Sequence, residues 1–528
     1  MRNALLSVYD KRGISEFAKK LALLNFRIIA SPGTAKELAK NGISVCKTTD
    51  FGSSCILGHR VVTLHPVFHA GLLAREDQKQ ELISQGFFWI DLVCVDLYPL
   101  KNEIEKPGAT RDLVLEMTDI GGPGLLRSAA KGRRIVIAEA EDRENVIKWL
   151  ESGEPDKENF LNGLGAKAEF IVSKYAAESA CYHSKKNYDF ISGEKISSCG
   201  YGENGWQIPA GLYSSDSNDP LALQKFKKVK GADLSYNNFC DLDRLLQTIT
   251  HIAAGWQINF GKVPKIAVAV KHGNACGAGV GDDAGVVLQK MIDGDRQAIF
   301  GGMVMANFPI NEAEATELAN YNSPQKRLLD AVFAPSFSDD AIKILKRAKG
   351  KCRFLANAAL ENLSYNSLDM APRFRYVRGG FLRQPNYSFV LDLKDSAILK
   401  SGQASPRDEE DMVLAWAVGC TSNSNTTAIV RDGQLLGNGV AQQDRVGSCE
   451  LGLTRLKKAG HNPAGAIAYT DSFFPFADGP ETLFRAGIKA VFASSGSIRD
   501  KEVFEAFQKN GVIFYAIPDA LGRGFFGH

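Results

Sequence analysis

The chain has 528 residues, a length that gives room for about three domains of ordinary size. Hydrophobic residues make up 45% and charged residues 23%, the balance of a folded protein, which excludes a chain that is mainly disordered. The 63 lysines and arginines against 60 aspartates and glutamates leave a net charge of +3, and the two densest basic stretches, residues 225–230 and 346–353, are short. Nucleic acid is therefore not an expected partner.

No apolar run reaches the roughly 18 to 20 residues that a membrane-spanning helix needs, and the charged residues Asp10, Lys11 and Arg12 come too early for a secretory signal. We therefore expect a cytoplasmic protein without a membrane partner. The ten cysteines form no CxxC pair, which argues against zinc ribbons and fits a reducing compartment. His65 and His69 have the spacing of a metal-binding pair but lack the glutamate of an HExxH motif, so we expect structural roles for both. No metal is predicted, and a monovalent cation is left open.

Short β-branched runs alternate with helical patterns over the N-terminal third of the chain. The predicted strands are Ala4–Val8, Arg27–Ala30, Val61–Leu64, Asp91–Asp96 and Arg134–Ala138. The predicted helices are Gly13–Leu24, a helix that begins at Ala35 with Thr34 as its cap, and a long helix from about Lys157 to His183. Short buried strands separated by helices predict a parallel sheet in an α/β fold.

A polar, turn-rich stretch over residues 184–220 predicts a domain boundary near residue 195. Beyond it, AVFAPSFS at 331–338 and AVFASSGS at 490–497 are each followed by a charged helix start and a short strand. This repeat predicts a duplicated α/β subdomain with a cleft between two like halves, with chance similarity over eight residues as the alternative. The predicted divisions are 1–195, 196–365 and 366–528.

The string IAVAVKHGNACGAGVG, residues 266–281, places Lys271 and His272 at the end of a buried strand, just before a glycine-rich turn with Asn274. Sites in α/β sheets form at strand ends, and a neighbouring cation lowers the pKa of a histidine, which keeps it neutral and able to accept a proton. A structural hydrogen-bonding histidine is the alternative. The glycines are spaced GxGxG instead of GxGxxG, and no GxxxxGK[ST] occurs, so neither a dinucleotide fold nor a P-loop is predicted.

Three further strings are singled out, and two of them are open to two interpretations each. DIGGPG, residues 119–124, is either an anion-binding helix start or a plain proline-initiated helix. Asn425 begins a predicted strand, and Arg445 ends the nearby string GNGVAQQDR. Asp471 with residues 473–476, FFPF, is either the edge of a core or a platform for a flat heterocycle.

Taken together, these strings resemble the family of AICAR transformylase / IMP cyclohydrolase. The N-terminal strings are LLSVYDKRGISEFAKKL, SPGTAKEL, RVVTLHPVFHAGLLAR, DLVCVDLYP and TDIGGPGLLRSAAK. The later strings are YGEN, LSYNN, VKHGNACG, FGG, APSFSDDA, SNTTAIVRDGQLLGNG, QQDR, DSFFPF and GSIRD. The resemblance covers nearly the whole chain, and the motifs follow the family order.

The resemblance implies an α/β fold with a methylglyoxal-synthase-like N-terminal domain, followed by two duplicated cytidine-deaminase-like subdomains. It also implies a homodimer with transformylase sites at the subunit interface. The implied reaction passes the formyl group of 10-formyltetrahydrofolate, a co-substrate, to the 5-amino group of AICAR, after which the cyclohydrolase closes the ring with loss of water. Small-molecule substrates, AICAR or a related amine and a reduced folate, are the expected ligands.

The resemblance also assigns roles to residues of this chain. The implied catalytic residues are Lys271, His272 as proton acceptor, and Asn425 near the transferred group. The implied residues for binding the acceptor are Tyr201, Asn238, Asp330, Arg445 and Phe526. The implied folate-binding residues are Asp471, Phe473 and Phe474. The implied cyclohydrolase-type residues are Lys11, Ser31, Gly33, Thr34, Arg60, Thr63, Tyr98, Asp119, Gly121, Gly122 and Lys131.

The chain departs from the family pattern mainly at polar and charged positions. In the cyclohydrolase motifs Val62 replaces a lysine, Asp96 replaces an asparagine, and Pro32 removes a backbone N–H donor from the turn that approaches phosphate. In the transformylase motifs, Gly200 and Gly524 replace two arginines that the resemblance assigns to the acceptor's phosphate.

Losing two such charged hydrogen bonds weakens phosphate binding by roughly a hundred-fold or more, unless a neighbour such as Arg523 compensates. We therefore keep three hypotheses. The first is a purine enzyme with both activities. The second is a diverged formyltransferase acting on another amine, with a silent first domain. The third is a folate- or nucleotide-binding regulator without turnover.

Overall fold

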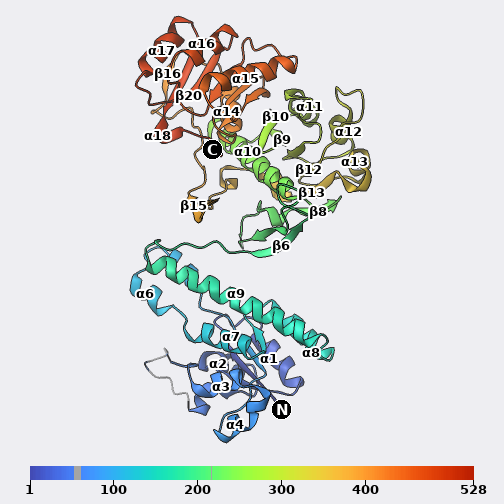
Figure 1. Cartoon of the computed structure of the whole chain (residues 1–528), viewed down its shortest axis with the longest axis vertical. Helices are drawn as coiled ribbons and strands as arrows, with labels where there is room; N and C mark the ends of the chain where they lie inside the picture. Colours follow the sequence, from blue (N-terminus) through green and yellow to red (C-terminus); the bar gives the residue numbers. More distant parts are fainter. Residues whose placement is uncertain (53–56, 58–60, 216, 528) are drawn as a thin grey trace. The chain divides into compact units, whose positions relative to one another are not determined.

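The computed structural model describes residues 1–52, 57, 61–215 and 217–527 (Figure 1). By its internal contacts the chain divides into two compact units, Met1–Ser192 and Gly193–His528. The division falls close to residue 195, where the sequence predicts the first boundary. The second predicted boundary, between residues 365 and 366, lies inside the second unit, whose two halves share one sheet.

The first unit is an α/β domain. Its strands are β1 (Arg2–Ser7), β2 (Phe26–Ala30), β3 (Cys46–Lys47), β4 (Leu92–Val95) and β5 (Ile135–Ile137). Its helices are α1 (Ile14–Leu23), α2 (Pro32–Lys40), α3 (Pro66–Leu73), α4 (Lys79–Ser84), α5 (Leu100–Glu105), α6 (Arg111–Glu116), α7 (Gly121–Lys131), α8 (Asp142–Glu151) and α9 (Lys157–His183).

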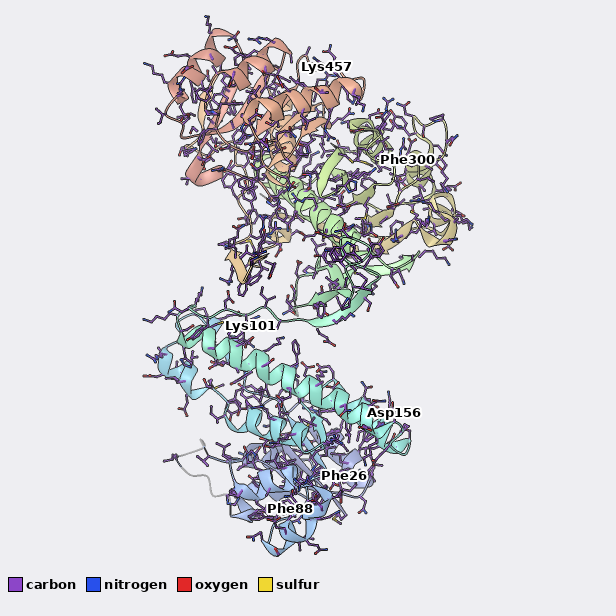
Figure 2. The ribbon with its side chains drawn as sticks, viewed as in Figure 1. Phe26, Phe88, Lys101, Asp156, Phe300 and Lys457 are labelled. Atoms are coloured by element: carbon purple, nitrogen blue, oxygen red, sulfur yellow. The ribbon has the colours of Figure 1, made fainter. Side chains whose placement is uncertain are left out.

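The five strands form one sheet in the order β3-β2-β1-β4-β5, and every neighbouring pair is parallel. Successive side chains of β1 point to opposite faces, so Leu6 enters one core with α1 and α8, while Leu5 enters the other with α3, α7 and α9. Phe26 packs in the first of these cores and Phe88 against the second (Figure 2). The parallel sheet predicted from the sequence is confirmed.

One predicted strand is wrong. Within the predicted strand Val61–Leu64, residues 62 and 63 form bends and residue 64 is irregular, and the edge of the sheet is β3 instead. The reason is local, because Pro66 begins α3 and the ring of His65 accepts a hydrogen bond from the Val67 N–H at 3.3 Å. The chain must turn before this cap, and an extended strand cannot do so.

The second unit is larger and contains a sheet of 12 strands and two separate hairpins. Its strands are β6 (Glu194–Cys199), β7 (Ala210–Ser214), β8 (Lys227–Lys230), β9 (Lys265–Lys271), β10 (Asn274–Gly281), β11 (Met303–Ala306), β12 (Ala331–Ala334), β13 (Arg353–Ala356), β14 (Arg373–Val377), β15 (Gly380–Gln384), β16 (Leu399–Ser401), β17 (Thr427–Arg431), β18 (Gln434–Gly439), β19 (Ile467–Thr470), β20 (Ala490–Ser495) and β21 (Ile513–Pro518). Its helices are α10 (Tyr236–Phe260), α11 (Ala284–Gly294), α12 (Glu312–Asn320), α13 (Asp339–Leu345), α14 (Pro406–Cys420), α15 (Arg445–Lys458), α16 (Asp478–Arg485), α17 (Asp500–Lys509) and α18 (Asp519–Gly522).

The large sheet consists of two copies of one topology. The order β10-β9-β11-β12-β13-β8 in one half matches β18-β17-β19-β20-β21-β16 in the other, and corresponding pairs have the same parallel or antiparallel sense. The repeated strings of the sequence are β12 and β20, which occupy equivalent positions. The halves join where β10 and β18 pair antiparallel, with Gly279 opposite Gln434. The predicted duplication is therefore present in the fold.

The core of this unit has three parts. Helices α10 and α14, one from each half, pack together against one face of the sheet and share a single core, and Thr248 is hydrogen-bonded to Thr421 between them at 2.9 Å. The other face carries two separate cores, one under α11, α12 and α13 and one under α15, α16 and α17. Figure 1 shows α10 as the long green helix beside β9 and β10.

The duplication extends to two tight hairpin turns. His272 and Gly273 connect β9 to β10 with φ values of 52° and 70°, and Asp432 and Gly433 connect β17 to β18 with 55° and 68°. An aspartate of the preceding helix accepts the glycine N–H in both copies, at 2.7 Å, Asp241 in the first and Asp411 in the second. Two left-handed residues in succession are typical of the hairpin turn that favours Asn-Gly or Asp-Gly.

Among the residues that the structure describes, none of the helices combines the length and the apolar character that crossing a membrane requires. The same residues contain no group of three or more histidine, cysteine, aspartate or glutamate side chains placed to hold a metal ion.

Candidate functional sites

The first unit contains a cavity of about 770 Å³ beyond the carboxyl ends of β1, β2 and β4. Open α/β sheets bind ligands at this edge, because strand ends and helix starts meet there. The lining residues are Ser7, Val8, Tyr9, Lys11, Ser31, Pro32, Gly33, Val62, Thr63, Leu64, Asp96, Tyr98, Leu115, Glu116, Met117, Thr118, Asp119, Ile120, Gly121 and Gly122.

Two helix starts face this cavity. The first turn of α2 contributes Pro32 and Gly33, and the side chain of its N-cap residue accepts no backbone hydrogen bond. The first turn of α7 contributes Gly121 and Gly122, and the Gly122 N–H donates to a carboxylate oxygen of Asp119 at 2.8 Å. The start of the DIGGPG string, residues 119–122, therefore lies on the wall of a cavity. Backbone N–H groups at such helix starts attract anions.

The side chains of the cavity are held by short-range contacts. The Lys11 ammonium donates to the Val8 carbonyl and, at 3.2 Å, to Thr34, and burial lowers its pKa. The Asp96 carboxylate accepts the N–H groups of Tyr9 and Asp10, and burial raises its pKa.

Asp119 and Tyr98 both line this cavity and are neighbours, since the Tyr98 backbone interacts with the Asp119 carboxylate. Burial raises the pKa of Asp119, and burial followed by the charge of Asp119 raises the pKa of Tyr98. Among the described lining residues Lys11 is the only cation, whereas Asp96, Glu116 and Asp119 are carboxylates. The cavity therefore offers groups for proton transfer but little side-chain charge for holding a phosphate.

Most of the cyclohydrolase-type residues predicted from the sequence lie together. Those that line the cavity are Lys11, Ser31, Gly33, Thr63, Tyr98, Asp119, Gly121 and Gly122. Thr34 is buried and reaches the cavity through its contact with Lys11, whereas Lys131 lies in the last turn of α7, the opposite end from the cavity. Arg60 lies outside the described residues. The sequence did not single out Glu116, because nothing in its spacing points to a site.

The candidate site of the second unit lies where the two halves of its sheet meet. Lys271 ends β9 and its ammonium donates to the Phe300 carbonyl at 2.7 Å (Phe300 is labelled in Figure 2). His272 follows in the hairpin turn and is exposed. A positive φ is uncommon for residues other than glycine, and asparagine, aspartate and histidine are the types that adopt it most often, so His272 suits this turn.

This turn is joined directly to the other half. The side-chain oxygen of Asn274 accepts the Asn423 N–H at 3.0 Å, and the Asn438 amide donates to the Ala275 carbonyl at 3.0 Å. Asn425 lies two residues beyond Asn423, and its amide donates to the Gln442 carbonyl at 2.9 Å. The structure therefore brings Lys271, His272 and the segment of Asn425 together from opposite halves of the duplication.

A buried ion pair fixes the segment around Asn425. Arg445 pairs with Asp471, and the two side chains are 8% and 0% exposed. The Asp471 carboxylate also accepts the Ser424 hydroxyl at 2.6 Å and the Thr426 N–H at 2.9 Å. Asp471 therefore holds the chain on both sides of Asn425, whereas the Nε of Arg445 is buried without a hydrogen-bond partner among the described residues.

The aromatic string after β19 is split between core and surface. Phe474 is 1% exposed and packs against Phe507 with ring centroids 6.2 Å apart, so it belongs to the core and offers no face to a folate. Phe473 is half-buried and Phe476 is 48% exposed. The platform predicted from the sequence is therefore reduced to these two rings.

The residues predicted to hold the acceptor are spread over the first half. Asn238 caps α10 and its amide lies 3.4 Å from the sulfur of Met303, at the same end of the sheet as His272. Asp330 precedes β12 at that end and is paired with Arg347. Tyr201 is 46% exposed in the loop after β6.

Asp241 is a neighbour of His272 that the sequence analysis missed. It accepts the Gly273 N–H, and burial raises the pKa of its carboxyl, while the charge of His272 and that of Arg244 oppose the rise. The signal was present in the duplication, because Asp411 occupies the matching position of α14.

Phe526 lies near the C-terminus and is 3% exposed. Its N–H donates to the Ser422 carbonyl at 2.9 Å, which places it beside the segment of Asn425. Two guanidinium groups lie over its ring, that of Arg244 at 4.3 Å and that of Arg373 at 3.3 Å from the centroid.

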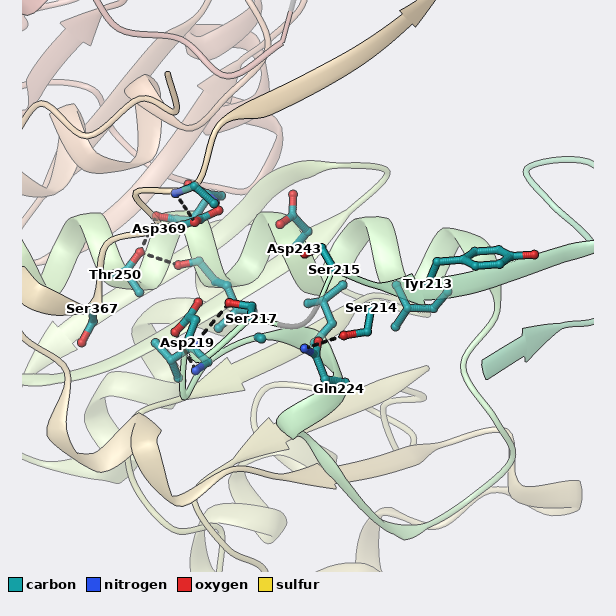
Figure 3. A pocket seen from close by; sticks show the side chains of 17 residues that line it. Tyr213, Ser214, Ser215, Ser217, Asp219, Gln224, Asp243, Thr250, Ser367 and Asp369 are labelled. Carbon is teal, nitrogen blue, oxygen red and sulfur yellow. Dashed lines mark hydrogen bonds between the residues drawn. The ribbon is translucent and has the colours of Figure 1, made fainter. Parts of the chain in front are cut away.

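A smaller cavity of about 230 Å³ opens between β7, α10 and the 3-10 helix at Tyr365–Ser367 (Figure 3). Its labelled lining residues include the carboxylates of Asp219, Asp243 and Asp369. Burial raises the pKa of Asp219 and Asp243, and the charge of Asp369 adds to both shifts. Arg373 balances this charge from one side, since it interacts electrostatically with Asp243 and Asp369.

Fold and sites together define a two-part protein of the α/β class, with a cavity at the end of a parallel sheet and a second candidate site at the seam of a duplicated sheet. A family model described as AICARFT/IMPCHase bienzyme matches residues 129–455, and one described as MGS-like domain matches residues 13–124. The chain belongs to the AICARFT/IMPCHase bienzyme family, which confirms the resemblance drawn from the sequence motifs.

Known relatives match along nearly the full length. A bifunctional purine biosynthesis protein PurH of Oceanobacillus iheyensis is 32% identical over 523 residues, covering 97% of either chain. PurH of Anoxybacillus flavithermus is 34% identical over 533 residues, again with 97% of either chain covered. The crystal structure of ForH is 32% identical and matches 35% of this chain and 99% of its own, with a TM-score of 0.33.

Proposed function

We propose that the chain catalyses both activities of its family, formyl transfer from 10-formyltetrahydrofolate to the 5-amino group of AICAR in the second unit, and closure of the ring to IMP in the first. The observation that carries the first activity is His272. It is an exposed imidazole in a left-handed turn whose twin in the duplicated half carries Asp432, the residue type that such a turn favours. The ring is exposed at the place where Lys271 and the segment of Asn425 meet, and this placement supports a role for it in the reaction.

The formyl acceptor is an amine on an aromatic ring, which is a weak nucleophile. Its nitrogen must lose a proton as it attacks the formyl carbon, and His272 is the proposed acceptor of that proton. Asp241 holds the turn next to His272, because its carboxylate accepts the Gly273 N–H at 2.7 Å. Lys271, with its ammonium fixed on the Phe300 carbonyl, is proposed to add positive charge at the same end of the sheet.

Asn425 is proposed to donate to the formyl oxygen as negative charge develops there, the task of an oxyanion-stabilising amide. Its position is supported by the ion pair of Arg445 and Asp471, which holds the backbone on its C-terminal side through Thr426. A group that must stabilise charge in a transition state gains from such rigidity, because no reorganisation is needed during the reaction.

Ring closure is proposed for the cavity of the first unit. Asp119 is the proposed base and Tyr98 the proposed proton donor, since both line the cavity and burial raises the pKa of each. The uncapped start of α2, at Ser31 and Gly33, is proposed to receive the phosphate.

Two further properties follow the family resemblance. The protein is proposed to be a homodimer with formyl-transfer sites completed at its interface. The exposed loop of Tyr201 supports this, because that residue is predicted to bind the acceptor yet is 46% exposed within one chain. A cytoplasmic location is proposed from the composition and from the cysteines without CxxC pairs.

The test is to supply purified protein with 10-formyltetrahydrofolate and AICAR and to measure tetrahydrofolate and IMP separately. Equal formation of both is the expected result. If tetrahydrofolate is released only when a different amine is supplied, that amine and not AICAR is the acceptor. Ligand binding without any turnover would reduce the protein to a binding role.

A second candidate, formyl transfer with a silent first unit, is favoured by the cavity lining. Val62 lines the cavity where the resemblance expects a lysine, and Asp96 adds a carboxylate where it expects an amide. Both changes lower the affinity for a phosphorylated ligand. In the assay above, this candidate requires that the formylated product accumulates and that IMP does not form.

A further inference from the structure

The two glycines that replace the expected arginines differ in their surroundings. A Cβ atom on Gly200 would have no heavy atom within 4 Å, so a side chain there is merely absent. A Cβ atom on Gly524 would clash with the hydroxyl and ring of Tyr387 and meet Cys420 at 2.9 Å. Position 524 therefore cannot carry an arginine in this fold, because Tyr387 fills the space.

Arg523, which could compensate for the missing arginine at position 524, contacts other residues instead. Its guanidinium lies 3.6 Å from the Asp519 carboxylate and 5.4 Å from the ring of Phe525. The contact with Phe526 is made by Arg244 and Arg373, which come from α10 and from the start of β14.

These two arginines differ in the use of their N–H groups. Arg244 donates to the Thr421 carbonyl and lies 3.4 Å from the side-chain oxygen of Asn423, so its donors serve the segment that leads to Asn425. Arg373 is half-buried, and its guanidinium donates no hydrogen bond to any residue that the structure describes. A guanidinium stacked on a ring keeps its in-plane donors, which match the oxygens of a phosphate.

We infer that Arg373 binds the phosphate of the acceptor nucleotide and replaces the arginine that the fold excludes at Gly524. The inference rests on the proposed function. Phe526 supports the stack, and Arg244 is a positioning residue that fixes the ring and the backbone next to it. Asp243 and Asp369, which line the smaller cavity (Figure 3), interact electrostatically with Arg373.

The ligand class is a phosphomonoester on a ribonucleoside. Because the phosphate is remote from the reacting amine, losing its partner is expected to raise KM much more than it changes kcat. The dephosphorylated riboside makes no use of Arg373, so it provides an internal reference for any general damage to the site.

The experiment compares AICAR with its riboside as acceptor in the wild type and in Arg373→Gln, which keeps length and polarity but removes the charge. The KM for AICAR is expected to rise roughly ten- to hundred-fold, the effect of losing a charged hydrogen bond, with the KM for the riboside unchanged. The matched control is Arg378→Ala, which removes a charge from the exposed loop between β14 and β15 and is expected to change neither constant.

Equal shifts for AICAR and the riboside, or no shift for either, would overturn the inference. Calorimetric titration of the same proteins with AICAR and the riboside, in the absence of folate, tests the same selectivity without turnover. If the wild type binds AICAR in preference to the riboside and Arg373→Gln does not, the inference holds even where the proposed reaction fails. If Arg373→Gln does not fold, Arg373→Lys serves, since a point charge without the planar fork is expected to lose part of the same selectivity, and full retention would overturn the inference.

Discussion

The two candidate sites are built in different ways. The cavity of the first unit lies at the end of one parallel sheet, and its walls are largely helix starts and loops, so its charge is set by a few replaceable side chains such as Val62 and Asp96. The site of the second unit draws on two halves of a duplicated sheet, tied through Asn274 and the pair of Arg445 and Asp471. Residues that hold a fold together are harder to replace than residues that only line a cavity. The departures from the family pattern in the first unit, Pro32, Val62 and Asp96, all belong to the lining of its cavity.

The largest expected effect is the loss of formyl transfer, without loss of ring closure, when His272 is replaced. His272→Ala should lower the rate of formyl transfer by about 10² to 10⁴-fold, because the amine loses its proton acceptor. Ring closure of the formylated intermediate, added directly, should be unaffected. The informative control is His272→Asn, since asparagine suits the left-handed turn but cannot take the proton. An active Asn variant would show that the position matters for its backbone alone.

The reciprocal change is made at Asp119 in the first unit. Asp119→Asn should lower the rate of ring closure by roughly a hundred-fold and leave formyl transfer intact. Because burial raises the pKa of Asp119, the wild-type rate of ring closure should fall on the acid side at a higher pH than an ordinary carboxyl would give. The ionised form is the base, so activity is present above that pKa and lost below it. A pH profile with the same acid limb in the Asn variant would remove Asp119 from this role.

The third change tests whether the second site depends on its buried support. Asp471→Asn leaves the Arg445 charge buried and unpaired, and the free energy of unfolding of the second unit should fall by about 3 to 5 kcal/mol. Chemical denaturation followed by a probe in that unit measures this. Glu481→Gln breaks an exposed pair with Arg485 and should change stability by less than about 1 kcal/mol. Similar losses in both variants would contradict the difference between buried and exposed pairs.

The smallest expected effect is a gain in the first unit. Val62→Lys adds a cation to a cavity wall where the described residues provide only Lys11, and it should lower the KM for ring closure by up to about ten-fold. Val62→Met adds comparable bulk without charge and should leave KM unchanged. If both variants behave alike, the cavity is not limited by phosphate binding.

Much of the fold could be read from the sequence, because its signals are local. The β-branched runs of β1, β2, β4 and β5 are long enough to be recognised, and the repeated AVFA strings mark β12 and β20. The strand predicted at Val61–Leu64 failed because the pattern of apolar residues does not reveal that His65 caps the helix that follows.

The candidate sites were less predictable, since they depend on contacts between distant residues. The pairing of Arg445 with Asp471 and the burial of Phe474 result from packing that no short string encodes. Arg244 and Arg373 were missed for the same reason, as α10 and β14 are far from Phe526 in the sequence. His272 was found because its position at a strand end and its neighbour Lys271 are visible in one string.

The twin hairpin turns suggest how such a site arises. Each half of the large sheet carries a turn with the same backbone conformation, supported by an aspartate of the preceding helix. The duplication therefore provides two equivalent exposed positions, each held by the same backbone contact. His272 occupies this position in one half, and Asp432, a residue type that such a turn favours, occupies it in the other. In a duplicated fold, one turn can therefore carry a reactive side chain while the other keeps the residue that stabilises it. The turn at Asp432 is thus a position where a second reactive side chain could be introduced by design.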